Sequence, residues 1–271
     1  MAGPDSITTA QLSRRIGLSD APIIIDVRDD DDFASDPRTV PTAIRRDYRT
    51  VAQWAPEFAG KTAIVTCQRG LKLSQGVAAW LRQEGIPAES LEGGHEAWVA
   101  GGGLLVRTAA LSPCGSDGRT VWVTRARPKI DRIACPWLIA RFIDDAPEFL
   151  YVPGDEVLKV ATATGATPYD IPGVEYGHHG EFCSFDAFIA KHGLTDPALH
   201  KLALIVRGAD CGAPHLAKEA AGLLAISKGL SLNFEDDHEM LKHGMVIYDA
   251  LYAWCAETPL QKVGRFLGMS R

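Results

Sequence analysis

The chain lacks the features that would place it in several common protein classes. No window approaches the about 18 to 20 consecutive apolar residues that a membrane-spanning helix needs, so we expect no transmembrane segment. The first residues carry neither the basic nor the apolar stretch of a secretory signal, which predicts a cytoplasmic protein. No repeat of fixed period and no low-complexity tract is present, which leaves ordinary globular domains.

Closely spaced cysteine pairs are also absent. The six cysteines, at positions 67, 114, 135, 183, 211 and 255, form no CxxC pair, and in a reducing compartment we expect them to be thiols. The net charge of −6 and the absence of a helix-turn-helix pattern argue against nucleic-acid binding. The length of 271 residues, with 46% hydrophobic content, is sufficient for about two domains.

The most informative segment is Cys67-Gln68-Arg69-Gly70-Leu71-Lys72, which follows the apolar run 62–66 and precedes a helical pattern. The first N–H groups of a helix have no intrahelical partner, and they favour an anion such as a thiolate. Gly70 permits a loop whose N–H groups face inward, and Arg69 and Lys72 add positive charge. The segment therefore predicts a nucleophilic thiol beside an anion site. The alternative is a buried cysteine that packs as a small hydrophobic residue.

Three motifs in order carry a family resemblance. They are Ile24-Ile25-Asp26-Val27-Arg28 with the later Val40-Pro41-Thr42-Ala43-Ile44, the cysteine loop, and Leu91-Glu92-Gly93-Gly94-His95-Glu96-Ala97-Trp98. Together they resemble the rhodanese (sulfurtransferase) family over about residues 5–108. The resemblance implies an α/β domain with a parallel sheet flanked by helices. Two departures, Thr42 for the usual glycine and Leu73 for a common serine, bear on substrate preference.

The resemblance also implies a reaction. Cys67 would take sulfane sulfur from thiosulfate or a related small anionic donor as a persulfide, and pass it to a thiol or cyanide acceptor. Arg69, Gly70 and Lys72 would bind the donor, and no cofactor is required. The expected partners include no nucleic acid and no membrane, and the sequence predicts no particular oligomeric state. A phosphatase or arsenate reductase is disfavoured, because a phosphate cradle usually has a longer loop with a closing arginine.

Further expectations concern the rest of this half and its boundary. Asp26 and Arg28 are expected to tie loops together, and Trp80 and Trp98 to be core aromatics. Ser, Pro and Gly concentrate in residues 110–118, which we interpret as a linker between a rhodanese-like domain, 1–109, and a second domain, 119–271.

The second half has the pattern of an α+β, helix-rich domain. We expect strands at 119–124 and 149–152, and helices at 136–143, 198–206, 217–226 and 239–256. Five motifs here resemble the C-terminal domain of the ChrB-type chromate-resistance family over about residues 120–256. They are 129–139, 170–175, 177–180, 183–186 and 206–210. The resemblance implies an association with chromate resistance. It leaves open an alternative function, a chromate-responsive sensor or regulatory protein that uses the rhodanese fold as an interaction module.

Imidazole, carboxylate and thiol groups crowd into residues 175–186. Glu175 and His178, with Asp210 from a distant loop, are the predicted ligands of a divalent metal, zinc or iron, and Asp131 is another possible ligand. The alternative is a polar loop in which a histidine caps backbone groups and Asp186 caps a helix that begins at Ala187.

A second cluster follows the strand that ends near Thr124. Arg125 and Arg127 make the segment cationic, and Arg132 and Cys135 are candidates for oxyanion binding or sulfur relay. The alternative is that Asp131 and Arg132 only fix the helix that follows.

Overall fold

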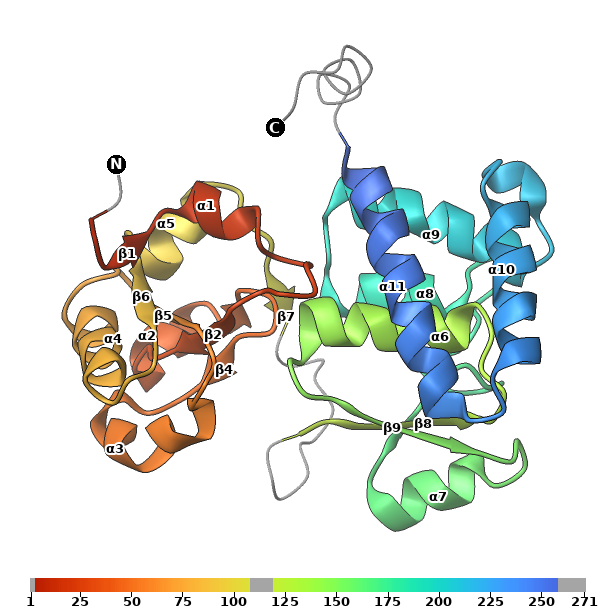
Figure 1. Cartoon of the computed structure of the whole chain (residues 1–271), viewed down its shortest axis with the longest axis horizontal. Helices are drawn as coiled ribbons and strands as arrows, with labels where there is room; N and C mark the ends of the chain where they lie inside the picture. Colours follow the sequence, from red (N-terminus) through yellow and green to blue (C-terminus); the bar gives the residue numbers. More distant parts are fainter. Residues whose placement is uncertain (1–2, 108–118, 258–271) are drawn as a thin grey trace. The chain divides into compact units, whose positions relative to one another are not determined.

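The computed structural model describes residues 3–107 and 119–257 (Figure 1). These residues form two compact units. The first contains the described residues up to Val121, with Leu138–Glu148 and Lys191–Leu194, and the second contains Trp122–Trp137, Phe149–Ala190 and the described residues from Thr195. The expected linker at 110–118 lies outside the described residues, so the exact domain boundaries stay a prediction.

The first unit is built on a five-stranded parallel sheet, as predicted. Its strand order is β1-β6-β5-β2-β4, and a separate antiparallel pair joins β3 to β7. The strands are β1 (Ser6–Ile7), β2 (Ile23–Asp26), β3 (Arg38–Thr39), β4 (Ile44–Arg45), β5 (Ala63–Thr66), β6 (Ala88–Leu91) and β7 (Val106–Arg107). The flanking helices are α1 (Thr9–Ser13), α2 (Asp30–Ser35), α3 (Val51–Trp54), α4 (Lys72–Gln83) and α5 (Gly94–Ala100), with short 3₁₀ turns at Tyr48–Thr50 and Ala55–Phe58.

The strand β5 lies at the centre of this sheet, and all four of its residues are buried. A continuous apolar run is typical of a parallel strand that is covered on both faces. Helix α4 packs on it through Val77, Ala78 and Leu81. Trp80 lies outside this helix face and is 40% exposed, so its prediction as a core residue is wrong. Trp98 is buried as predicted, and its indole N–H donates to the Leu104 carbonyl at 2.8 Å.

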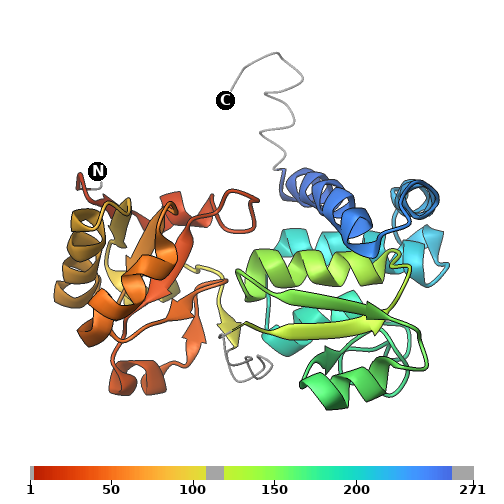
Figure 2. The ribbon, with the colours of Figure 1, turned by 60° about the horizontal axis from the view of Figure 1, so that its bottom comes forward.

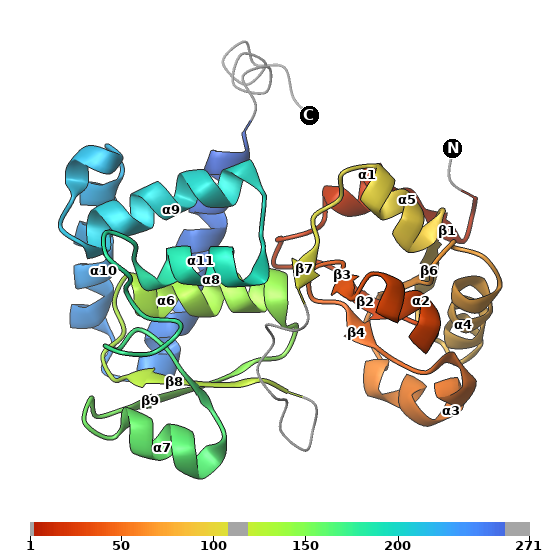
Figure 3. The same cartoon turned by 180° about the vertical axis from the view of Figure 1, so that it is seen from behind.

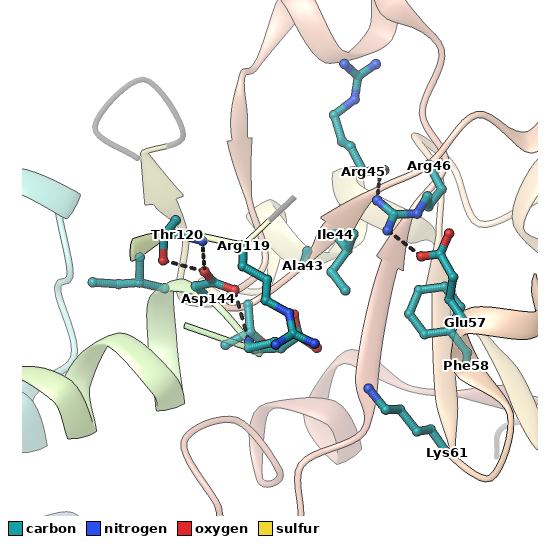
Figure 4. Close-up of a pocket in the computed structure, with 14 residues that line it drawn as sticks. Ala43, Ile44, Arg45, Arg46, Glu57, Phe58, Lys61, Arg119, Thr120 and Asp144 are labelled. Atoms are coloured by element: carbon teal, nitrogen blue, oxygen red, sulfur yellow. Dashed lines mark hydrogen bonds and ion pairs between the residues drawn. The ribbon is translucent and has the colours of Figure 1, made fainter. Parts of the chain in front are cut away.

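Side chains away from the cysteine loop also pair within the first unit (Figure 4). The Arg46 guanidinium donates to the Glu57 carboxylate at 2.8 Å, and the Thr120 N–H donates to the Asp144 carboxylate at 3.0 Å. These contacts hold short segments of the unit in place.

The second unit contains a three-stranded sheet and most of the helices of the second half. The sheet order is β10-β8-β9, with β8 (Val121–Arg125), β9 (Glu148–Val152) and β10 (Thr167–Pro168), and β10 is parallel to β8. In Figures 1 and 3, α6 and α8 to α11 lie on one side of β8 and β9, and α7 lies on the other. These helices are α6 (Asp131–Leu138), α7 (Val157–Thr164), α8 (Ser184–His192), α9 (Pro197–Asp210), α10 (Ala220–Asn233) and α11 (Asp237–Ala256). This half is therefore α+β and helix-rich, as predicted.

Helix α6 begins earlier than the sequence suggests. It starts at Asp131, contains Pro136, and continues as a π-helical turn over Ile139–Ile143. A proline has no N–H to donate to the carbonyl four residues before it, which is usually costly inside a helix. Here the freed carbonyl of Arg132 accepts a hydrogen bond from the Tyr151 hydroxyl at 3.3 Å. The neighbouring strand β9 thus supplies the donor that Pro136 lacks, and the helix can extend through the proline.

The ribbon in Figure 2 shows the same elements from a second direction. Across residues 3–107 and 119–257, no helix is both long enough and apolar enough to cross a membrane.

Candidate functional sites

Cys67 directly follows the central strand β5 and lies five residues before the start of α4. Its side chain is 4% exposed, and its Sγ lies 3.2 Å from the Ser74 hydroxyl in the first turn of α4. That hydroxyl also donates to the Leu71 carbonyl at 3.3 Å. Ser74 was not predicted as part of the site. Its signal in the sequence is a polar residue on the buried face of an amphipathic helix.

The loop that follows Cys67 contains backbone N–H groups without acceptors among the described residues. Gly70 has a φ of 66°, a left-handed conformation that glycine adopts without steric cost. Within the described part of the chain, the main-chain N–H groups of residues 68 to 73 donate to no acceptor. Such groups at the start of a helix are suited to bind an anion.

The third sequence motif, residues 91–98, is hydrogen-bonded to this loop. The His95 N–H donates to the Cys67 carbonyl at 2.9 Å, and the Glu96 N–H donates to the Gln68 carbonyl at 3.0 Å. A Cβ on Gly94 would overlap the Cys67 carbonyl, and a Cβ on Gly70 would overlap the Leu91 carbonyl. Gly94 of this motif and Gly70 of the loop thus allow two backbone segments to pack directly against each other.

The two cations of the loop lie at its surface. The Arg69 side chain is 73% exposed, and its Nε lies 3.5 Å from the Glu96 carboxylate. Lys72 is exposed and forms no ion pair with any residue that the structure describes. Both charges are therefore accessible to an incoming anion, and the charge of Lys72 is the less compensated of the two.

Asp26 and Arg28 form a buried ion pair, with the Arg28 Nε 2.9 Å and the Nη2 2.6 Å from the Asp26 Oδ2. The same guanidinium donates to the carbonyls of Asp36 and Arg38, both at 2.8 Å. The His95 ring approaches the Asp36 carboxylate at 3.1 Å, and burial lowers the pKa of His95. These contacts join β2, β3 and α5, which agrees with the expected structural role of the pair.

A second cluster of ionisable groups lies in the second unit. The Nε2 atom of His178 is 3.5 Å from the Asp131 Oδ2, 3.3 Å from the Asp170 Oδ1 and 3.2 Å from the Asp210 Oδ2. Asp131 is fully buried and Asp170 is nearly so, whereas the His178 side chain is 42% exposed. Three carboxylates thus surround one imidazole nitrogen.

The fold explains why these residues meet. Asp131 begins α6 after β8, and Asp170 follows β10, so both lie beyond the carboxyl ends of parallel neighbouring strands. Asp210 ends α9. The Ser184 N–H donates to the Asp131 Oδ2 at 2.6 Å, and the Ser184 hydroxyl donates to the Asp170 Oδ1 at 3.1 Å. The other Asp131 oxygen, Oδ1, is buried and accepts no hydrogen bond from the described residues.

The electrostatics of the cluster reflect crowded negative charge. Burial, and then repulsion from Asp131, raise the pKa of Asp210 to about 7. Burial also raises the pKa of Asp131. The hydrogen bond to Asp131 is the largest of the effects that raise the pKa of His178 to about 9.

The structure brings together two of the three predicted metal ligands. His178 and Asp210 are in contact, but the exposed Glu175 lies outside both clusters of metal-binding groups found among the described residues. The segment around Glu175 is irregular, so a spacing of three does not place its carboxylate beside His178. The polar-loop interpretation holds for His179, whose ring contacts the Glu175 carbonyl at 2.9 Å. Asp186 accepts from the Cys183 N–H at 3.1 Å, but α8 begins at Ser184 and not at Ala187.

The proposed oxyanion or sulfur-relay role of Arg132 and Cys135 does not fit the structure. Cys135 is fully buried, and burial raises the pKa of its thiol far above the usual value. The Arg132 Nε lies 3.2 Å from the Asp170 Oδ2, and its Nη1 donates to the Ala126 carbonyl at 2.9 Å. Arg125 also donates to the Asp170 Oδ2, at 3.0 Å. These arginines already have a carboxylate partner, so they fix the start of α6, as the structural alternative expected.

The first domain is a parallel α/β domain with a cysteine loop at the carboxyl end of its central strand. The second is a helix-rich domain with a cluster of one histidine and three aspartates. Comparison with known families agrees with this division. The family model of the rhodanese-like domain matches residues 8–101, and that of ChrB, C-terminal domain, matches residues 122–255. The chain therefore consists of a rhodanese-like domain followed by a ChrB C-terminal domain.

Individual relatives match parts of the chain. "Protein ChrB" of Cupriavidus metallidurans is 33% identical over 141 residues, which are 52% of this chain and 42% of that protein. The chain thus matches less than half the length of this relative.

Among solved structures, a rhodanese-like domain protein from Staphylococcus aureus is 30% identical to this chain. The match covers 35% of this chain and 90% of that protein, with a TM-score of 0.32. A thiosulfate sulfurtransferase from Pseudomonas aeruginosa is 24% identical to this chain. The match covers 37% of this chain and 19% of that protein, with a TM-score of 0.32.

Proposed function

We propose that this chain is a sulfurtransferase that moves sulfane sulfur through a persulfide on Cys67. The observation that carries the proposal is the position of the Cys67 sulfur at the end of β5, beside a loop whose N–H groups at residues 68 to 73 have no acceptor among the described residues. A persulfide is an anion one atom longer than a thiolate. N–H groups without an acceptor beside the sulfur would stabilise its terminal charge.

The proposed reaction has two balanced steps. In the first, the Cys67 thiolate attacks the outer sulfur of thiosulfate, a sulfur–sulfur bond forms, and sulfite leaves with the electron pair of the broken bond. In the second, a thiophilic acceptor such as cyanide or a thiolate attacks the terminal persulfide sulfur, and the Cys67 thiolate is regenerated. The low exposure of Cys67, at 4%, favours a small donor. No general base is required when the thiol reacts in its ionised form.

The charges of the loop support an anionic donor. Arg69 and Lys72 are exposed on the loop, and Lys72 has no ion-pair partner among the described residues. The proposal includes a cytoplasmic location, because a reducing compartment keeps Cys67 available as a thiol. It also associates the second domain with chromate resistance, through the ChrB family of its match.

A transfer assay with thiosulfate as donor and cyanide as acceptor tests the proposal. We expect thiocyanate formation by the wild-type protein, its loss in Cys67→Ser, and wild-type rates in Cys211→Ser, which removes an exposed cysteine of the second unit. Circular dichroism verifies that each variant is folded. Transfer by folded Cys67→Ser would assign the nucleophile to another cysteine. A wild-type protein that transfers sulfur from no donor tested would favour the interaction-module alternative.

A further inference from the structure

We infer that Asp131, Asp170, His178 and Asp210 form a divalent metal site in the second domain. The site is independent of the proposed sulfur transfer, because its residues come from α6, α9 and the segment after β10. It also differs from the ligand set expected from the sequence, since Asp170 is added and Glu175 is not part of it.

The spacing of the donor atoms fits a coordination shell. A tetrahedral ion with bonds of about 2.0 to 2.2 Å to nitrogen and oxygen holds its ligand atoms about 3.4 Å apart. The distances from His178 Nε2 to the oxygens of Asp131, Asp170 and Asp210 are 3.5, 3.3 and 3.2 Å. The donor atoms of Asp131, Asp170 and His178 also all lie within 4.8 Å of one another. His178 Nε2 thus lies at the separation that a shared ion requires from each of the three carboxylates. Asp210 and His178 form a second group of possible ligands together with Cys211.

The hydrogen bonds of the cluster leave an oxygen that needs a partner. The Asp131 side chain is fully buried, and its Oδ2 faces His178, yet its Oδ1 accepts no hydrogen bond from any described residue. A buried carboxylate oxygen without a donor is costly. A metal ion beside His178 that both Asp131 oxygens contact would supply the missing partner without adding another side chain.

A protonated His178 alone explains the gathering of three carboxylates around its Nε2 less well than a metal ion does. The single N–H on His178 Nε2 can donate well to one carboxylate, but three compete for it. The two arginines at the site, Arg125 and Arg132, both contact the Oδ2 of Asp170. Of the other two carboxylates, that of Asp131 accepts the Ser184 N–H on its Oδ2, and that of Asp210 contacts His178. A divalent ion with a neutral imidazole interacts with all three carboxylates at once.

The donor set indicates the class of metal. One imidazole with carboxylate oxygens suits Mn²⁺, Fe²⁺ and Zn²⁺ better than soft ions that prefer thiolates. Hydrogen bonds from Ser184 to Asp131 and Asp170 orient two of the ligands, as the partners of metal-binding carboxylates usually do. The half-exposed His178 gives an ion access from solvent.

Metal content and affinity of the full chain test the inference. The purified protein is stripped with a chelator, dialysed separately against Zn²⁺ and Mn²⁺, washed, and subjected to elemental analysis. We expect stoichiometric metal in the wild type. Asp210→Asn should weaken binding by more than the about 10- to 100-fold loss typical of a supporting residue. Glu175→Gln is the matched control, because it removes a carboxylate from the same loop as His178 and should bind metal as the wild type does.

Thermal unfolding gives a second measurement that does not depend on the fully buried Asp131. Added Zn²⁺ should raise the unfolding midpoint of the wild type and of Glu175→Gln, but not that of Asp210→Asn. A wild-type protein that takes up neither ion overturns the inference. Equal binding by the wild type and Asp210→Asn, or an equal loss in Glu175→Gln, also overturns this assignment of ligands.

Discussion

The contact between Gly94 and the cysteine loop gives a sharp test of how the fold holds Cys67. Gly94 has a φ of 59°, and a Cβ there would overlap the Cys67 carbonyl and the Gly70 nitrogen. Gly60 has a similar φ of 78°, but a Cβ there would meet nothing within 4 Å. Substituting alanine at each position therefore separates the cost of the backbone conformation from the cost of displacing the loop.

Both variants should lose about 1–2 kcal/mol of unfolding free energy, the usual cost of a left-handed conformation for a residue with a Cβ. Gly94→Ala should lose more, because the segments 67–70 and 93–96 must separate. Its larger effect should be on the reaction. A displacement of about 1 Å at a reacting group can reduce the rate about a hundredfold. We therefore expect kcat/KM for thiosulfate to fall about a hundredfold in Gly94→Ala and to stay unchanged in Gly60→Ala.

Denaturant unfolding gives the stabilities, and initial rates of thiocyanate formation give kcat/KM. Equal stabilities of Gly94→Ala and Gly60→Ala, with wild-type kcat/KM in both, would refute the reasoning. That result would mean that the third sequence motif does not control the shape of the loop around Cys67.

Three further predictions concern charge and pH. Lys72→Ala should reduce the use of thiosulfate more than that of a neutral sulfur donor at matched ionic strength, and equal losses would mean that the lysine only shapes the loop. Asp26→Asn should lower the unfolding free energy by about 3–5 kcal/mol, because it leaves Arg28 buried without its carboxylate, and a loss below 1 kcal/mol in denaturant unfolding would contradict this. Burial lowers the pKa of His95, so the unfolded state binds the proton more readily. The unfolding free energy should therefore decrease as the pH falls through about 6.5, and His95→Gln should reduce this slope; identical slopes from pH 7 to 5 would argue against it.

The sequence predicted the first domain well because local and long-range signals agree there. The apolar run at 62–66 becomes the buried central strand β5, and the glycine-containing loop leads into α4 as expected. The role of Gly94 could not be derived from local patterns. It depends on a contact between segments about 25 residues apart in the chain, which only the fold brings together.

The second domain shows where sequence reasoning failed. Pro136 suggested that a helix starts after Cys135, but Tyr151 supplies the missing hydrogen-bond donor, and no local pattern indicates that contact. Asp170 was not predicted as a ligand because it precedes the dense run of ionisable groups at residues 175–186. The parallel pairing of β8 and β10, which brings Asp170 and Asp131 together, involves only a two-residue strand.

The central claim is that Cys67 carries the transferred sulfur, and the most direct measurement is the intact mass of the protein after incubation with thiosulfate and removal of excess donor. We predict a gain of one sulfur atom in the wild type, loss of this adduct after addition of cyanide, and no adduct in folded Cys67→Ser. Peptide mapping should locate the sulfur on the peptide that contains Cys67. An unchanged wild-type mass, or an adduct that persists in Cys67→Ser, would contradict the account.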